Sequence, residues 1–132
     1  MEIKETGIEG LIEIIPAMLH DDRGWFMESY NKDKFDELGL KLNFVQDNLS
    51  FSNAGVLRGI HFQKSPYGQG KLVKVIQGEV LDVAVDLRPN SPTFGQHEKV
   101  LLSAEKQNML FIPEGFGHGF LALKDSYLFY KC

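Results

Sequence analysis

Short apolar runs, separated by glycine and proline turns at regular spacing, fill the chain from residue 43 to its end. Each run has the usual length of a β-strand and is too short to be stable as an isolated helix. Many such runs in succession predict an all-β sandwich or jelly roll. The predicted strands are 44–48, 56–63, 71–76, 80–87, 99–103, 109–112, 116–123 and 127–131.

One turn signal and one alternation add detail to this pattern. The sequence Gln77-Gly78-Glu79 predicts a hairpin between the strands on either side of it. Within the second of these strands, apolar residues alternate with Asp82, Ala84 and Asp86. Because side chains alternate between the two faces of a strand, these three residues share one face.

The N-terminal part of the chain is less regular. Residues 1–19 alternate loosely and predict one or two strands, and residues 25–30 predict another strand after a polar turn. Residues 31–39 carry the one convincing helix pattern, which Asn31 can cap and Gly39 can end. Two helical turns are marginal alone, so we expect Phe35 and Leu38 to pack this helix on a sheet.

Composition limits the classes of protein to consider. The chain has 132 residues, no repeats and no linker, which predicts a single domain over 1–132. The net charge of −4 gives no support to a nucleic-acid or anionic-membrane partner. No apolar run approaches the roughly 18 residues of a membrane span, and no signal peptide is visible. The single cysteine, Cys132, excludes an internal disulfide, and we expect a cytoplasmic protein.

The strand 56–63 contains polar residues that a strand filling a core does not need, namely Arg58, His61 and Gln63. On a regular strand Arg58 and His61 would face opposite sides. A bulge at Gly59 would instead turn both into one cavity. The alternative is an Arg58 that points to solvent and pairs with a surface carboxylate.

His118 lies between two glycines, Gly117 and Gly119, which let a ligand or another backbone come close. We expect the strands that carry His61 and His118 to line one pocket. The alternative for His118 is a core histidine with a satisfied hydrogen bond. Lys71 either reaches the mouth of this pocket or is a solvated edge residue. A set of histidine, arginine and lysine suits an anionic ligand and proton transfer.

A metal site is disfavoured by the same strand. Two positions after His61 the chain has Gln63 instead of a second histidine, and glutamine is a poor ligand for zinc or iron. His20 and His97 lie in turn-like segments without a ligand partner at useful spacing. We therefore expect no metal.

A series of short motifs runs in order along nearly the whole chain: 22–24 with Phe26, 28–30, 44–48, 56–63, 70–73, 82–88, 91–96, 112–116 with 118–120, and 130–131. With these motifs the sequence resembles the dTDP-4-dehydrorhamnose 3,5-epimerases of the cupin superfamily. The resemblance implies a cupin-type jelly roll with one short helix, and a homodimer without metal or cofactor. It implies epimerisation at C3 and C5 of dTDP-4-dehydro-6-deoxy-D-glucose in dTDP-L-rhamnose and polysaccharide biosynthesis.

The resemblance also implies roles for individual residues. His61 matches the base that removes the proton next to the ketone, and Lys71 matches a residue that stabilises the enolate oxygen. Tyr130 matches the acid that returns a proton from the other face of the sugar. The implied substrate-binding residues are Arg23, Phe26, Glu28, Gln46, Asn48, Arg58, Lys71 and His118.

The end of the chain departs from the family pattern, because family members are longer by several tens of residues. We expect that residues 1–132 lack a C-terminal segment, and that this segment would hold the carboxylate that orients His61. Loss of such a partner can cost orders of magnitude in rate. Two alternatives therefore stay open besides the 3,5-epimerase: a related nucleotide-keto-sugar epimerase acting at one carbon, and a non-catalytic nucleotide-sugar-binding remnant. A metal-dependent cupin oxygenase is disfavoured by Gln63.

Overall fold

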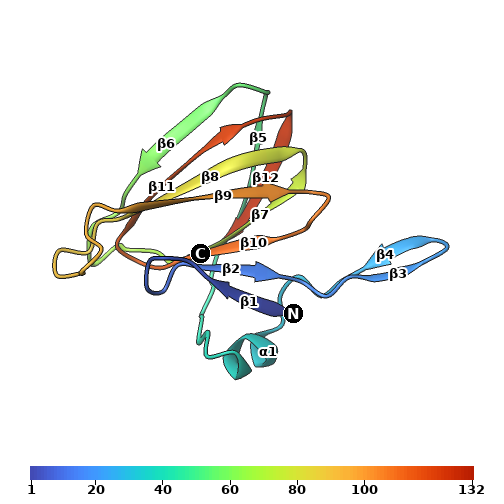
Figure 1. Cartoon of the computed structure of the whole chain (residues 1–132), viewed down its shortest axis with the longest axis horizontal. Helices are drawn as coiled ribbons and strands as arrows, with labels where there is room; N and C mark the ends of the chain where they lie inside the picture. Colours follow the sequence, from blue (N-terminus) through green and yellow to red (C-terminus); the bar gives the residue numbers. More distant parts are fainter.

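Alternating apolar residues build two antiparallel sheets that pack face to face in a computed structural model describing residues 1–132 (Figure 1). The six-stranded sheet has the order β1-β2-β10-β7-β12-β5, and the four-stranded sheet has the order β6-β11-β8-β9. The elements are β1 (Glu2–Glu5), β2 (Ile12–Ile15), β3 (Leu19–Asp21), β4 (Gly24–Phe26), α1 (Lys32–Glu37), β5 (Asp47–Ser52), β6 (Leu57–His61), β7 (Lys71–Gln77), β8 (Glu79–Asp86), β9 (His97–Ser103), β10 (Met109–Ile112), β11 (Phe116–Ala122) and β12 (Ser126–Lys131). The prediction of an all-β sandwich with one short helix is confirmed.

The main core lies between the two sheets. Val73 and Val75 of β7 face Val80 and Ala84 of β8, and all four are fully buried. Full burial of a valine or larger apolar side chain contributes roughly 1.5–3 kcal/mol to the free energy of unfolding. This layer is therefore the main source of stability. The inner surfaces of the two sheets are therefore fixed by packing wherever they are apolar.

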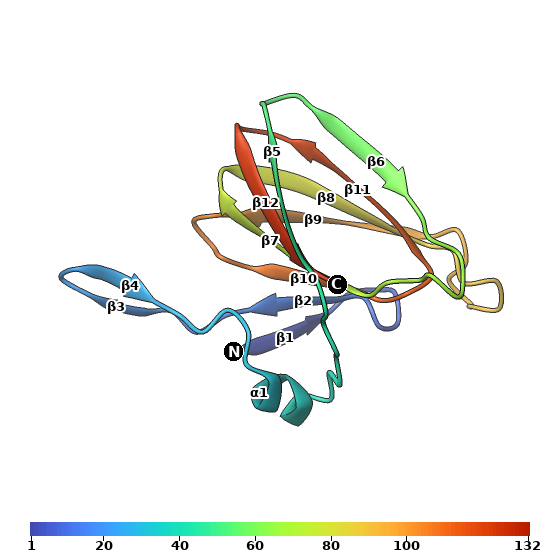
Figure 2. The same ribbon diagram turned by 180° about the vertical axis from the view of Figure 1, so that it is seen from behind.

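A second apolar cluster lies on the outer face of the six-stranded sheet, where α1 covers it (Figure 2). Phe35 of α1 is fully buried there beside Ile14 and Met109. The side chain of Asn31 accepts a hydrogen bond from the Lys34 N–H at 3.2 Å. Gly39 follows the helix with φ +80°. The predicted cap and stop are confirmed, and so is the docking through Phe35, whereas Leu38 is 38% exposed because it forms the C-cap beyond the last turn. No helix of the chain has the length and apolar character that crossing a membrane requires.

The hairpin predicted at Gln77-Gly78-Glu79 is wrong. β7 pairs with β10 and β12, whereas β8 pairs with β9 and β11, so the chain changes sheet at this turn. Gly78 has φ +91°, and a Cβ on it would lie 2.3 Å from the Ser126 Oγ. The glycine thus permits a tight corner against Ser126 instead of a return beside the same strand.

Two predicted strand boundaries also need correction. The strand predicted over 25–30 ends at Phe26, after which the chain turns toward α1 and Tyr30 packs edge-on against Phe35 at 5.0 Å. The strand predicted over 44–48 runs instead over Asp47–Ser52, where β12 supplies its hydrogen-bonding partner along the whole length. The strand therefore begins three residues later than predicted and extends four residues further.

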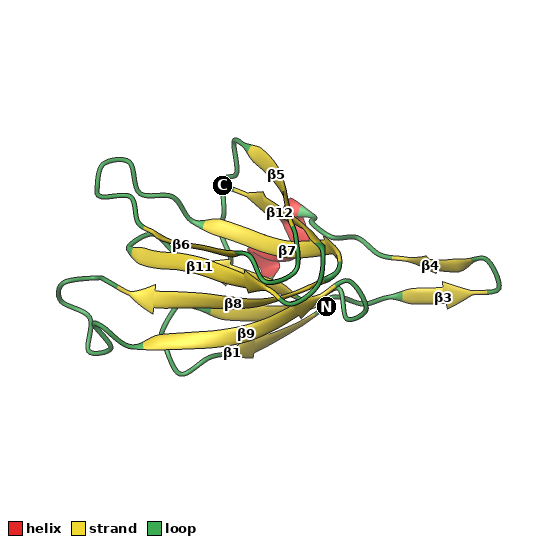
Figure 3. Ribbon diagram, turned by 90° about the horizontal axis from the view of Figure 1, so that it is seen from above, coloured by secondary structure: helices red, strands yellow, loops and turns green.

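β3 and β4 form a separate hairpin, here called the arm, that extends away from the sandwich (Figure 3). Every residue of both strands is exposed. Leu19, Trp25 and Phe26 expose 68%, 50% and 64% of their surface. Isolated two-stranded hairpins are marginally stable in water, so an arm this apolar is suited to contact with another surface.

Candidate active site

The pairing of β6 with β11 brings the two histidines together. His61 lies directly opposite His118, whereas Arg58 lies opposite Phe120, so β6 uses one extra residue between these pairs. Residues opposite each other in an antiparallel pair share a face. The predicted bulge is therefore confirmed, and Arg58 and His61 point to the same side.

Gly59 makes this bulge possible. Its φ is +92°, and a Cβ on it would lie 2.6 Å from the carbonyl oxygen of His118. Gly119 is just as tight, because a Cβ there would lie 2.7 Å from the carbonyl oxygen of Arg58. Only glycine on both strands lets β6 and β11 approach closely enough to place the two histidines side by side.

The facing sheet supplies the other wall of the site. Tyr130 of β12 lies opposite Val73 of β7, on the inner face that Lys71 also shares. The Lys71 Nζ is 5.7 Å from the centre of the Tyr130 ring. A phenol and an ammonium thus face two imidazoles across the opening between the sheets.

A cavity of about 320 Å³ lies between these walls and is lined by His61, Lys71, His118 and Tyr130, with Phe116 and Gly115. An adjoining cavity of about 210 Å³ shares these four polar residues and adds Arg58. The larger volume falls in the range of small-molecule sites. The prediction that the two histidine strands line one pocket is confirmed.

The structure adds one residue that the sequence prediction missed, Asp82 of β8. It is fully buried, and its Oδ2 lies 2.8 Å from the His118 Nε2. Its Oδ1 has no hydrogen-bond partner in the chain. Burial raises the pKa of the Asp82 carboxyl, although the nearby His118 and Lys71 act against this rise. The signal was present in the alternation of β8, whose acidic face turns inward.

Lys71 is held partly out of water in the same cavity. Burial lowers the pKa of its ammonium, and interaction with Cys132 and Asp82 opposes this effect. A cation with reduced hydration interacts more strongly with a developing negative charge than one in bulk water. The geometry is therefore suited to stabilising an anionic oxygen in the cavity.

Arg58 is exposed at the edge of the site and forms no ion pair. Its Nε donates to the Ser52 Oγ at 2.8 Å, and a terminal nitrogen donates to the Phe51 carbonyl at 3.0 Å. The alternative of a surface carboxylate partner is therefore wrong. Among residues 1–132, no carboxylate lies within ion-pair distance of His61 either. The buried carboxylate of Asp82 pairs with His118 instead.

Three further residues of the predicted binding set lie at the start of β5 or near α1. Asn48 lies opposite Tyr130 on β12 and donates to the Cys132 Sγ at 3.4 Å. Gln46 donates to the Asn48 Oδ1 at 2.9 Å. Glu28 is paired with Lys34, which lowers the pKa of its carboxyl. Asn48 thus adjoins the cavity wall, whereas Glu28 lies outside it.

Arg23 and Phe26 are not brought to this cavity, because both lie on the arm. The Arg23 Nε donates to Asp21 at 3.1 Å, within the same hairpin. The chain contains no group of three or more histidine, cysteine or acidic side chains placed to hold a metal ion.

Comparison with known proteins places these features in a family. The sequence model of the dTDP-4-dehydrorhamnose 3,5-epimerases matches residues 5–132. The dTDP-4-dehydrorhamnose 3,5-epimerase of Methanothermobacter thermautotrophicus is 55% identical over 129 residues, which are 97% of this chain and 69% of that protein. The dTDP-4-dehydrorhamnose 3-epimerase of Streptomyces niveus is 45% identical over 126 residues, which are 95% of this chain and 61% of that protein.

A solved structure agrees with these relatives. The dTDP-6-deoxy-D-glucose-3,5-epimerase of Legionella pneumophila, in complex with dTDP-4-keto-L-rhamnose, is 49% identical to this chain and superposes with a TM-score of 0.94. The match covers 99% of this chain and 70% of the Legionella protein. The chain therefore belongs to the dTDP-4-dehydrorhamnose 3,5-epimerase family and has a cupin-type jelly roll.

Proposed function

We propose that this chain is an isomerase that converts dTDP-4-dehydro-6-deoxy-D-glucose to dTDP-4-dehydro-L-rhamnose by epimerisation at C3 and C5, in dTDP-L-rhamnose biosynthesis. The observation that carries the proposal is the convergence of His61, Lys71 and Tyr130 from two facing sheets on one cavity. Family membership supports the substrate class. Epimerisation leaves the oxidation state of the sugar unchanged, so the reaction requires no redox cofactor.

The first half of the reaction removes a proton from carbon. The C4 ketone makes the protons at C3 and C5 acidic, because the electron pair left behind moves onto the ketone oxygen as an enolate. His61 takes this proton, since an imidazole exchanges protons near neutral pH. Lys71 stabilises the enolate oxygen, where negative charge develops in the transition state.

The second half returns a proton to the same carbon from the opposite side. Tyr130 is suited to this role because it belongs to the sheet that faces His61. Its phenol gives its proton to the carbon as the enolate returns to the ketone, and the phenolate and imidazolium then exchange protons with water. Removal from one face and return from the other inverts the centre.

Substrate binding completes the proposal. Arg58 is placed in the adjoining cavity, where its planar guanidinium can bind two oxygens of a diphosphate. Arg23 and Phe26 lie on the arm, which supports a homodimer in which the arm of one copy contributes to the cavity of the other. Asn48 and His118 contact the sugar beside Tyr130 and His61.

A mixing experiment tests the dimer. The variants Arg23→Ala and His61→Ala should each have little activity, but subunit exchange between them should restore about a quarter of the unaltered activity. This recovery is expected because half of the dimers are then hybrids with one complete site. No recovery after demonstrated exchange would show that the arm does not serve the partner's site.

Two alternatives are favoured by specific observations. The Streptomyces niveus relative carries the name of a 3-epimerase, which favours action at one carbon only. The lack of a carboxylate partner for His61 among residues 1–132 favours a nucleotide-sugar-binding module without turnover.

A cytoplasmic location is also part of the proposal, supported by the unpaired Cys132 thiol, and cell fractionation tests it.

Reaction in deuterium oxide separates these possibilities. With dTDP-4-dehydro-6-deoxy-D-glucose as substrate, we expect deuterium at both C3 and C5, and none with the variant His61→Asn. Deuterium at C3 alone would replace the proposal with the single-carbon epimerase. Thermal stabilisation by dTDP-sugar without any exchange would replace it with the binding module.

A further inference from the structure

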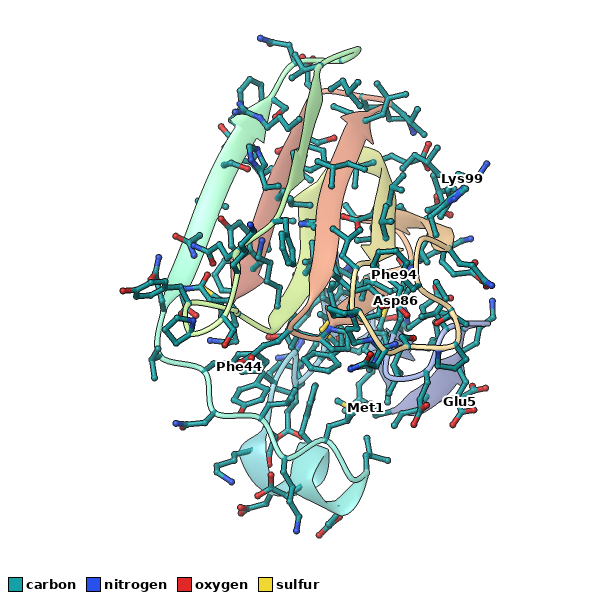
Figure 4. The ribbon with its side chains drawn as sticks, turned by 90° about the vertical axis from the view of Figure 1, so that its left-hand side faces the viewer. Met1, Glu5, Phe44, Asp86, Phe94 and Lys99 are labelled. Atoms are coloured by element: carbon teal, nitrogen blue, oxygen red, sulfur yellow. The ribbon has the colours of Figure 1, made fainter.

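Asp86, the second buried carboxylate of β8, is hydrogen-bonded on both oxygens. Its Oδ1 accepts from the backbone N–H and the Nε of Arg88, both at 3.0 Å. Its Oδ2 accepts from the Arg88 Nη2 at 3.0 Å, from Ser91 at 2.5 Å and from Thr93 at 2.6 Å. The loop that supplies Ser91 and Thr93 returns to Asp86, whose backbone N–H donates to the Gln96 carbonyl at 2.8 Å. Figure 4 labels Asp86 and, in this loop, Phe94.

The fork of Arg88 is therefore fixed in one orientation, and its guanidinium carbon lies over the ring of Phe116. The guanidinium carbon is 4.8 Å from the centre of that ring. The Arg88 Nη2 also donates to the Glu9 carbonyl at 3.0 Å, which holds the guanidinium from a third side. Arginine combines bidentate pairing with aromatic stacking, whereas lysine supplies only a point charge.

The aliphatic part of the Arg88 side chain packs against Gly115, the residue before Phe116. Gly115 has φ +88°, and a Cβ on it would lie 2.7 Å from the Arg88 Cγ. The Leu87 N–H donates to the Gly115 carbonyl at 3.0 Å. Gly115 thus lies directly against the side chain of Arg88, at the turn into β11.

Gly115 and Phe116 both line the cavity that holds His61 and His118, whereas Arg88 does not reach it. We propose that Arg88, locked by Asp86, is a positioning residue: it sets the plane of the Phe116 ring and thereby the wall against which the keto sugar lies. This inference rests on the proposed function. It assigns to the Asp86–Arg88 pair a role in catalysis without contact with the substrate.

A double-mutant cycle in kcat/KM tests the inference. The variant Arg88→Lys keeps the charge but loses the fork and the stacking, and we expect about a tenfold loss of kcat/KM, because small displacements at an active site are costly. In the Phe116→Leu background the same change should cost less than twofold, since the ring through which Arg88 acts is gone. Lys32→Met, which breaks an exposed ion pair of α1, is the control and should leave kcat/KM unchanged.

Equal losses in both backgrounds, or no loss in a folded Arg88→Lys protein, would overturn the inference. If Arg88→Lys does not fold, Ser91→Ala replaces it, because this change loosens the carboxylate while keeping both charges. We then expect a two- to threefold loss that again disappears in the Phe116→Leu background.

A spectroscopic readout separates this inference from the proposed function. In protein with 13C-labelled phenylalanine, the ring signals of Phe116 should shift in Arg88→Lys and stay unchanged in Lys32→Met. Unchanged Phe116 signals would overturn the positioning role even in an active enzyme. Absence of turnover by the unaltered chain would instead overturn the proposed function, and with it the catalytic meaning of a shifted Phe116.

Discussion

Two carboxylates of β8 lie four residues apart on the same inward face, and both are fully buried, yet their surroundings are opposite. At the Asp82 end, one carboxylate oxygen is hydrogen-bonded to His118 and the other has no partner. Burial raises the pKa of the Asp82 carboxyl. At the Asp86 end, Arg88 and two hydroxyl groups hold the pKa well below its ordinary range.

The difference shows two uses of a buried carboxylate in the same strand. A carboxylate with its hydrogen bonds satisfied contributes to stability, whereas one left partly unsatisfied in a closed site costs free energy. Acids with a shifted pKa beside other titratable groups are typical of functional sites, where proteins keep such an unfavourable arrangement. Asp82, whose pKa is raised and which lies near His118 and Lys71, fits this pattern. The Asp86 end therefore determines the shape of the site, and the Asp82 end determines its electrostatics.

The largest expected effect is on activity at the Asp82 end. Asp82→Asn should lower kcat/KM by about a thousandfold, because His118 and Lys71 lose the negative charge beside them. The free energy of unfolding should stay constant or rise by about 1 kcal/mol, since a buried charge with an unpaired oxygen is removed. Steady-state kinetics and urea unfolding measure the two effects. Retention of more than a tenth of the activity would assign Asp82 a structural role.

The second effect is on stability at the Asp86 end. Asp86→Asn should lower the free energy of unfolding by about 3 kcal/mol, because it leaves Arg88 without its counter-charge. Asp33→Asn, a change of the same kind on the exposed first turn of α1, is the control for both carboxylates; it should leave activity unchanged and lower the free energy of unfolding by less than about 1 kcal/mol. A loss at Asp86 no greater than that of the control would remove the contrast between the two ends of β8.

The pH dependence of stability should carry opposite signs at the two positions. The folded-state pKa of Asp86 is below its ordinary value of 3.8, so its contribution is complete above that pH and declines as the pH falls below it. The folded-state pKa of Asp82 is above 3.8, so Asp82 lowers stability as the pH rises from 3.8 through the folded-state value.

Urea unfolding at a series of pH values therefore distinguishes the variants. Relative to the unaltered chain, Asp86→Asn should flatten the decline in stability below about pH 4, whereas Asp82→Asn should gain stability above it. If the free energy of unfolding depended on pH in the same way for the two variants, the pKa values of Asp82 and Asp86 would not be shifted in opposite directions.

The smallest expected effect comes from a single hydroxyl group. Ser91→Ala removes one of the donors to the Asp86 carboxylate and should cost about 1 kcal/mol of unfolding free energy, the usual value of one hydrogen bond. Ser29→Ala, which removes a hydroxyl outside this cluster, is the control. An equal effect of the two changes would mean that Arg88 and Thr93 hold Asp86 without a contribution from Ser91.

Local chemistry made some features predictable from the sequence. Asn31 and Gly39 bound the helix because a cap and a stop depend on a few neighbouring residues. The bulge at Gly59 was predictable because the side-chain period of a strand is two, and Arg58 and His61 are an odd number of residues apart. The pocket between the two histidine strands followed from that same parity.

Features that depend on distant partners were not predictable. The turn at Gly78 has hairpin composition, but the partners of β7 and β8 come from other parts of the chain. The contact of Asp82 with His118 spans 36 positions and depends on which face of β8 turns inward. Arg23 lies on the arm, away from the cavity. The order of the motifs had grouped it with the binding residues that do line the cavity.

The extra residue at Gly59 has a consequence for how this site can vary. Because it sets the phase of β6, deletion of a single residue there would turn either Arg58 or His61 away from the cavity while leaving every side chain chemically unchanged. No substitution elsewhere on the strand could restore the lost partner. The placement of Arg58 and His61, the proposed phosphate-binding and proton-transfer residues, on one side of β6 therefore depends on the number of residues in the strand as much as on their identity.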